Sequence, residues 1–213
     1  MKDKKTIFID LDGTILDVSE RNYRVYKDIL QKYNKKFLSK KNFLKLKRNK
    51  ISIKNLLRKT KAEEIFKKFE KEWFNLIEKS DYLNLDTIPQ NRRSFLLTLK
   101  KKYSLILVTL RNDKKALINQ LKNMKLINLF DKILVASGRK VRNKWKIKSK
   151  LIKSFDTYSK DSIIIGDTES DILAGKYLGF KTVAVFSGMR DKKILKKFKP
   201  DSLVRDISEI NNL

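Results

Sequence analysis

Short apolar segments alternate with longer amphipathic ones along most of this chain, and that alternation constrains the fold more than any other feature. The apolar segments are rich in β-branched residues and span 6–10, 105–109, 132–137, 162–166 and 181–186. Helical patterns fill the intervals 90–101, 113–124, 144–154, 169–178 and 190–197. Short, nearly continuously apolar strands are typical of parallel sheets with helices on both faces. The pattern therefore predicts an α/β fold with a doubly wound parallel sheet.

One long interval breaks the alternation. About 95 residues separate the first apolar segment from the second, and they contain no convincing strand. From Ser19 to Lys79 apolar residues recur at the three- and four-residue spacing of amphipathic helices. The interval is too long for one crossover helix, so it predicts an inserted helical subdomain over residues 17–88. Residues 1–16 and 89–213 then form the core domain, and Pro89 marks the return to it.

Two missing residue types narrow the chemistry. The 213 residues include no cysteine and no histidine, which excludes disulfides, thiolate and histidine metal sites, and catalysis by Ser-His or Cys-His pairs. Carboxylates, hydroxyls, lysines, backbone groups and a bound ion remain. No stretch approaches the roughly 20 apolar residues of a membrane span, and the N-terminus lacks the cleavage site of a secretory signal. We therefore expect a cytoplasmic protein that does not span a membrane.

The formal net charge of +28 has two interpretations. It can serve a polyanionic partner such as nucleic acid, or it can reflect a composition in which lysine far exceeds arginine. The excess is local, because residues 21–61 carry 16 Lys or Arg and a single acid, Asp28. The aromatic residues of this segment have the spacing of a helical core rather than of base-stacking side chains. We favour composition bias over a nucleic-acid partner, and the sequence does not indicate an oligomeric state.

Acidic residues directly follow two of the expected strands. Asp10 and Asp12 end the first strand and precede Gly13, which permits a tight turn. Asp167 follows the fourth strand, and Asp171 lies one helical turn further on. The carboxyl ends of strands in an open α/β sheet form the ligand-binding crevice, so these side chains are expected to converge there.

Converging carboxylates repel one another unless a cation neutralises them, and oxygen-only ligands favour Mg²⁺. A carboxylate can attack phosphorus to form an aspartyl-phosphate, and a metal shields the attacking anion and stabilises the transferring group. A second carboxyl two residues away can protonate the leaving oxygen and later deprotonate the hydrolytic water. The residues therefore predict metal-assisted phosphoryl transfer.

These residues match the motifs of a known family. The run DLDGT at 10–14 resembles the first motif of the haloacid dehalogenase (HAD) superfamily, Thr109 the second, and GDTESD at 166–171 the fourth. The chain is most similar to phosphoglycolate-phosphatase-like members with a helical cap. The resemblance implies a Rossmann-like parallel-sheet core with the cap inserted between the first two motifs, which is the place of residues 17–88.

The resemblance also assigns roles to the carboxylates. It implies that Asp10 is the nucleophile and Asp12 the general acid/base. It further implies that Mg²⁺ is held by Asp10, the backbone carbonyl of Asp12 and Asp167, with Asp171 in support. These assignments make the chain a candidate phosphoric monoester hydrolase.

Asp12 separates the activities within the superfamily. Dehalogenase members lack an acid two residues after the nucleophile, so the resemblance implies a phosphatase that hydrolyses a small phosphorylated metabolite. A phosphomutase with the same nucleophile is an alternative. A nucleic-acid-associated phosphatase or binding protein that uses the basic insertion is another.

The substrate phosphate is expected to contact the second and third motifs. For the second, we assign Thr109, Leu110 and Arg111, and Arg111 either binds a substrate anion or lies on the surface. The third is a lysine that pairs with the phosphate and the nucleophile. The candidates are Lys144, Lys146 and Lys148. We choose Lys144, because it begins the amphipathic segment that leads into the next helix.

Overall fold

The structure of the chain, a computed structural model, describes residues 5–139, 141–155, 158–159 and 161–210. These residues form a six-stranded parallel sheet in the order β3-β2-β1-β4-β5-β6. The strands are β1 (Thr6–Ile9), β2 (Ser104–Thr109), β3 (Lys132–Val135), β4 (Ile163–Gly166), β5 (Lys181–Val185) and β6 (Ser202–Val204). The five predicted strands are confirmed. β6 is an additional, half-buried edge strand that the sequence pattern does not predict.

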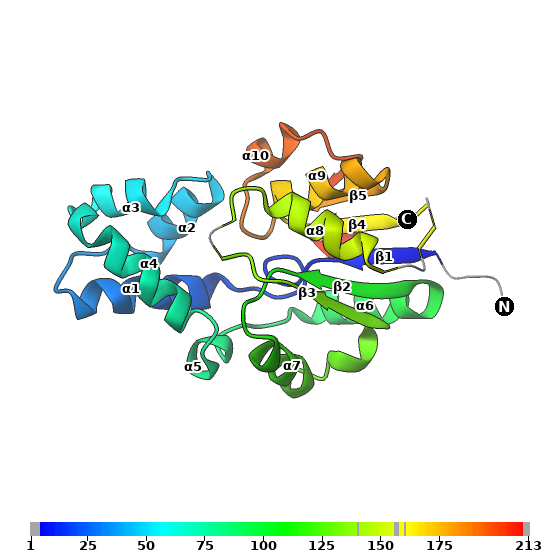
Figure 1. Cartoon of the computed structure of the whole chain (residues 1–213), viewed down its shortest axis with the longest axis horizontal. Helices are drawn as coiled ribbons and strands as arrows, with labels where there is room; N and C mark the ends of the chain where they lie inside the picture. Colours follow the sequence, from blue (N-terminus) through cyan, green and yellow to red (C-terminus); the bar gives the residue numbers. More distant parts are fainter. Residues whose placement is uncertain (1–4, 140, 156–157, 160, 211–213) are drawn as a thin grey trace.

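Helices cover both faces of the sheet. The core elements are α6 (Gln90–Lys102), α7 (Lys114–Asn123), η2 (Ile127–Leu129), α8 (Lys144–Lys153), α9 (Glu169–Leu178), α10 (Lys192–Lys196) and η3 (Ile207–Glu209). Figure 1 shows α6 and α7 on one face and α8, α9 and α10 on the other. Successive side chains of a strand point to opposite faces, so Ile7 packs with the first layer and Phe8 with the second. The structure confirms the doubly wound α/β fold.

A separate group of helices lies at the end of the molecule opposite the N-terminus (Figure 1). Its elements are α1 (Ser19–Lys32), α2 (Lys40–Arg48), α3 (Ile53–Lys59), η1 (Glu63–Ile65), α4 (Phe66–Leu76) and α5 (Ser80–Leu83), and we call them the cap. All lie within residues 17–88, the range expected for the insertion. The cap has its own apolar cluster, in which the rings of Tyr26 and Phe43 stack 4.5 Å apart. Burial of each such side chain stabilises the fold by about 2 kcal/mol.

Two chain segments connect the cap to the core. They run side by side at Asp17 and Thr87, whose backbone groups exchange hydrogen bonds of 2.8 and 3.2 Å. The cap also contacts the core directly, because the Arg48 guanidinium donates to the carbonyls of Ser187 and Gly188 at 3.0 and 3.1 Å. These contacts hold the cap over the carboxyl ends of the strands.

No helix among the described residues is both long enough and apolar enough to cross a bilayer.

Candidate active site

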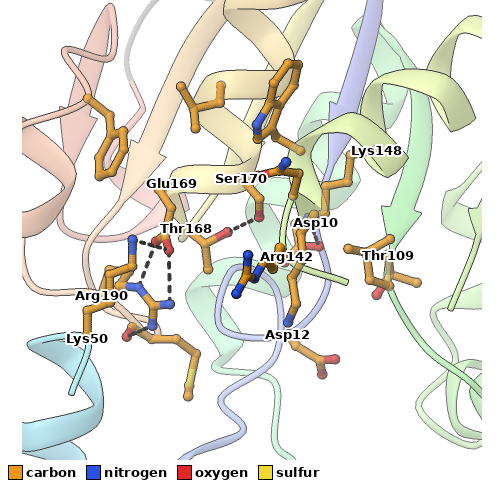
Figure 2. Close-up of a pocket in the computed structure, with 17 residues that line it drawn as sticks. Asp10, Asp12, Lys50, Thr109, Arg142, Lys148, Thr168, Glu169, Ser170 and Arg190 are labelled. Carbon is orange, nitrogen blue, oxygen red and sulfur yellow. Dashed lines mark hydrogen bonds and ion pairs between the residues drawn. The ribbon is translucent and has the colours of Figure 1, made fainter. Parts of the chain in front are cut away.

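Asp10 lies directly after β1, in the middle of the sheet. Its backbone N–H donates to the carbonyl of Ile165 at 2.9 Å, which extends the pairing of β1 with β4 by one residue and fixes the position of the side chain. Asp10 is 8% exposed. The ammonium of Lys148, on α8, lies 2.6 Å from Asp10 Oδ1 (Figure 2). It also contacts a carboxylate oxygen of Asp171. A buried lysine therefore bridges two of the carboxylates predicted to converge.

Asp167 and Asp171 complete what we call the acidic cluster: Asp10, Asp167 and Asp171. One carboxylate oxygen from each lies within 4.8 Å of the others. Asp167 is fully buried. Its Oδ2 accepts a hydrogen bond from the N–H of Met189 at 2.5 Å, and its Oδ1 has no hydrogen-bond partner among the described residues. Asp171 caps the first turn of α9, where its Oδ2 accepts from the N–H and hydroxyl of Thr168.

The charges of the acidic cluster are poorly compensated. Burial, reinforced by Asp171, raises the pKa of Asp10 to about 7 against the opposing effect of Lys148. Burial and the two neighbouring carboxylates raise the pKa of Asp167 well above its ordinary value. One ammonium thus faces three carboxylates. An orphaned, buried carboxylate oxygen within an all-oxygen donor set fits a hard divalent cation.

The turn after Asp12 requires a glycine beside this cluster. Gly13 adopts φ = +86°, a conformation that side chains disfavour. A Cβ atom at this position would lie 2.1 Å from Oδ2 of Asp167. The glycine therefore serves both the turn and the close approach of the first and fourth motifs.

Asp12 has a different environment from Asp10, because two arginines bind its carboxylate. Arg111, just after β2, donates from Nε and Nη2 at 2.5 and 2.6 Å, and Arg21 of α1 donates at 2.5 Å. Burial acts to raise the pKa of Asp12, but Arg111 and Arg21 outweigh it and hold the pKa below its usual range. Both arginines also approach Asp86, at 3.0 Å from Arg21 and 3.9 Å from Arg111. The carboxyl of Asp86 accepts from Gln120 at 2.7 Å.

The structure changes two sequence-based assignments. Arg111 is only 4% exposed, which excludes the alternative that it lies on the surface, and its bidentate contact is with Asp12 rather than with an open site. The lysine in contact with the expected nucleophile is Lys148 and not Lys144, which is exposed at the start of α8. Lys144 and Lys148 lie on the same side of α8. Lys148, one helical turn further along, is the buried one.

The remaining predicted residues line a cavity of about 390 Å³ above the acidic cluster. Thr109, Leu110 and Lys144 all line it, together with Asp10 and Asp12. The cavity wall also includes residues that the sequence did not single out. Lys50 of the cap and Arg190 of the core both pair with Glu169, at 2.9 and 2.8 Å (Figure 2).

Arg21 and Asp86 were also missed in the sequence. Arg21 is one of 16 basic residues in its segment, and no spacing relates it to Asp12. Asp86 lies in the return from the cap, where nothing marks it as a partner of the site. Only the folded chain brings these two residues to the first motif.

Comparisons with known proteins agree with this geometry. The family model described as haloacid dehalogenase-like hydrolase matches residues 7–185. The pyrophosphatase PpaX of Oceanobacillus iheyensis is 23% identical over 97% of this chain and 94% of its own length. A haloacid dehalogenase-like hydrolase from Streptococcus pneumoniae superposes with a TM-score of 0.77 at 19% identity, covering 97% of this chain and 96% of that one. A predicted phosphoglycolate phosphatase from Haemophilus somnus gives 0.74 at 22% identity, with 98% and 97% covered.

Proposed function

Because the chain belongs to the haloacid dehalogenase-like hydrolase family, we propose that this enzyme is a Mg²⁺-dependent phosphatase that acts through an aspartyl-phosphate on Asp10. The observation that carries the proposal is the contact of the buried Lys148 with Asp10 and Asp171, beside a carboxylate oxygen of Asp167 that no described residue hydrogen-bonds. An anionic nucleophile can approach an anionic phosphate only where cations offset both charges.

The residues that would hold the ion are Asp10, Asp167 and the backbone carbonyl of Asp12, with Asp171 in support through its contact with Lys148. When bound, Mg²⁺ supplies the positive charge that lets a phosphate approach the acidic cluster. Lys148 supplies a second positive charge from the side of α8. Asp10 and Asp171 raise the pKa of Lys148 above its ordinary value despite its burial, so its ammonium stays protonated across the physiological range.

The first chemical step forms a bond between a carboxylate oxygen of Asp10 and the phosphorus of the substrate. The bond from phosphorus to the leaving oxygen breaks, and that oxygen takes a proton from the carboxyl of Asp12. Arg21 and Arg111 hold Asp12 as the anion in this structure. Protonation of Asp12 therefore requires its contacts with these two arginines to lengthen.

The second step hydrolyses the acyl phosphate. Asp12, now a carboxylate, takes a proton from a water molecule, whose oxygen attacks the phosphorus. The bond from phosphorus to Asp10 breaks, and inorganic phosphate and the original carboxylate are restored. The two arginines stabilise the anionic form of Asp12 that this step needs.

The size of the cavity supports the proposed substrate class. A volume of about 390 Å³ suits a small phosphorylated metabolite. Two relatives agree, since one is named for pyrophosphate and another for phosphoglycolate.

Replacement of the nucleophile tests the mechanism. Asp10→Asn keeps the shape of the side chain but loses the attacking anion, so we expect phosphate release from an aryl phosphate to fall at least about 10³-fold. Rapidly quenched wild-type enzyme should carry one phosphoryl group by mass spectrometry, and the variant none. Asp161→Asn, which changes an exposed acid, is the matched control and should match the wild type. An Asp10→Asn enzyme with wild-type turnover would contradict the mechanism.

A further inference from the structure

Three cations at the mouth of the site are not ion-paired with any acid of the described residues. Lys47 of α2, Arg142 and Lys144 form no ion pair with any acid in the part of the chain that the structure describes. We call these three residues the basic rim. Arg190 and Lys50 lie beside them, but these two share Glu169 and are partly neutralised by it.

The basic rim borders the same space as the acidic cluster. Lys144 and Arg142 line the cavity of about 390 Å³ that contains Asp10. Lys47 and Lys144 both line an adjoining cavity of about 280 Å³ beneath the cap. The two cavities share Asp12 and Lys144 in their walls, so one small molecule can reach from the nucleophile to the rim.

Lys47 is not an ordinary solvated lysine. It is only half-exposed, and its ammonium lies 5.4 Å from the ring centre of Trp73. Burial, together with the nearby charges of Arg190 and Lys144, lowers its pKa to about 8. Partial desolvation at the cavity wall and the charges of Lys148 and Arg190 also lower the pKa of Lys144, against the weaker opposing effect of Glu169 and Asp10. Cations kept close together without an ion-paired acid are unfavourable unless an anion binds among them.

We propose that Lys47 and Lys144 form a subsite for a second anionic group of the substrate, close in the molecule to the phosphoryl group that Asp10 attacks. The proposal rests on the proposed phosphatase activity and adds the substrate class. The second group is a phosphoryl, as in a diphosphate, or a carboxylate, as in a phosphorylated short hydroxy acid. In either case the group stays on the leaving side of the molecule and departs with the oxygen that breaks from phosphorus.

The place of Lys47 in the proposed subsite also connects the choice of substrate with the cap. Lys47 and Lys144 come from elements nearly 100 residues apart, one in the cap and one in the core. An anion bound between them contacts both parts of the molecule. A substrate with a neutral leaving group lacks this contact and depends on the acidic cluster and Lys148 alone.

Kinetics with three substrates test the subsite. We compare pyrophosphate, 2-phosphoglycolate and an aryl phosphate with a neutral leaving group, using wild type, Lys47→Met, Lys144→Met and the double variant. We expect wild-type kcat/KM to favour at least one of the two doubly anionic substrates over the aryl phosphate by tenfold or more. Each single change should lower that ratio about tenfold, and the double change should lower it further. Which of the two substrates is preferred identifies the second group as phosphoryl or carboxylate.

Controls separate the subsite from a general loss of folding. Lys45→Met removes an exposed lysine of the same helix and should leave the ratio at the wild-type value. A wild-type enzyme without preference for the doubly anionic substrates would overturn the proposal. So would an equal loss on all three substrates in the Lys47 and Lys144 variants.

Binding distinguishes failure of the subsite from failure of the proposed phosphatase activity. Methylenediphosphonate keeps two phosphoryl groups but has no bridging oxygen to cleave, so calorimetry with Mg²⁺ measures its Kd without turnover. We expect Lys47→Met and Lys144→Met each to raise this Kd about tenfold. If no substrate is hydrolysed but the Kd rises as expected, the subsite holds and the phosphatase proposal fails. An unchanged Kd in both variants overturns the subsite whatever the activity.

Discussion

The acidic cluster and the basic rim lie at the same cavity, and each carries charge that its neighbours do not fully compensate. The excess charge is negative in the cluster and positive in the rim. In the cluster, three carboxylates share one lysine, and the pKa values of Asp10 and Asp167 are raised. In the rim, Lys47 and Lys144 have no ion-paired acid among the described residues, and their pKa values are lowered. Each region is unfavourable by itself. The difference supports the proposed positions of the two ligands, a cation at the bottom of the site and an anion at its mouth.

The two regions also differ in how firmly the fold fixes them. The acidic cluster lies at the ends of β1 and β4 and at the start of α9, where backbone pairing holds the residues in place. The rim combines a cap helix with the first residue of α8. Replacements in the cluster should therefore change the chemistry itself, whereas replacements in the rim should change the choice of substrate.

Loss of the buried lysine should have the largest effect among the tests of this comparison. Lys148→Met leaves the carboxylates of Asp10 and Asp171 without their ammonium and removes a cation beside the transferring phosphate. We expect kcat on an aryl phosphate to fall about 10³-fold, the range found when one preorganised electrostatic contact is removed. Steady-state phosphate release measures the effect.

Two other lysines of α8 serve as comparisons for Lys148. Lys146→Met changes an exposed side chain that lies over the ring of Trp145 and should remain within about twofold of wild type. Lys144→Met should affect aryl phosphate hydrolysis less than tenfold, since its proposed partner is the second anionic group. A 10³-fold loss in Lys144→Met with a mild effect in Lys148→Met would return the catalytic assignment to Lys144.

The acidic cluster was predictable from the sequence because its residues follow apolar strands. Asp10 and Asp167 come directly after such runs, and parallel strands bring their carboxyl ends to one edge. The choice between Lys144 and Lys148 was not predictable in the same way. The two lysines lie four residues apart on the side of α8 that also carries the buried Ile152. Only the packing of α8 against the sheet shows which of the two is buried.

Lys47 of the rim and Arg21 beside Asp12 could not be found in the sequence. Lys47 and Arg21 lie among 16 basic residues in a segment with one acid, so charge carries no positional information there. Their roles depend on how the cap docks against the core, which no local pattern encodes. β6 was missed for another reason, because three half-buried residues at a sheet edge are too short a run to show a period.

The pH dependence of stability should reveal the charge deficit of the acidic cluster without any substrate. The pKa of Asp10 is about 7 in the folded protein, above its ordinary 3.8, so the folded state binds more protons than the unfolded state between these values. Stability should therefore fall as the pH rises from about 4 to about 7. In EDTA we expect a loss on the order of 2 kcal/mol over this window. The chain has no histidine, but Asp86, whose pKa burial raises to about 6, adds a slope of the same sign in this window.

Urea unfolding with and without Mg²⁺ measures this slope. Saturating Mg²⁺ should remove most of it, because the ion offsets the charges that favour protonation. Asp167→Asn should be more stable than wild type in EDTA at pH 7, and its melting temperature should no longer rise with Mg²⁺. Asp161→Asn should behave as wild type. A flat pH profile in EDTA, or an unchanged response to Mg²⁺ in Asp167→Asn, would contradict a metal site at the cluster.

The smallest effect is expected where the two kinds of region meet, at Glu169. This acid neutralises Lys50 of the cap and Arg190 of the core, and these cations outweigh burial to lower its pKa to about 2. Its ion pairs stabilise the protein above the unfolded pKa of about 4.5, and that contribution is lost as the pH falls through about 2. Glu169→Gln should therefore lower the free energy of unfolding by about 1 kcal/mol at pH 7 and by almost nothing at pH 2.

Glu169→Gln also leaves the neighbourhood of the rim more positive. The KM for a doubly anionic substrate should therefore fall a few-fold in low salt, and this decrease in KM should become smaller as salt is added. A rise in KM instead would mean that Glu169 acts mainly by docking the cap, through Lys50, and that the charge of the rim does not limit binding.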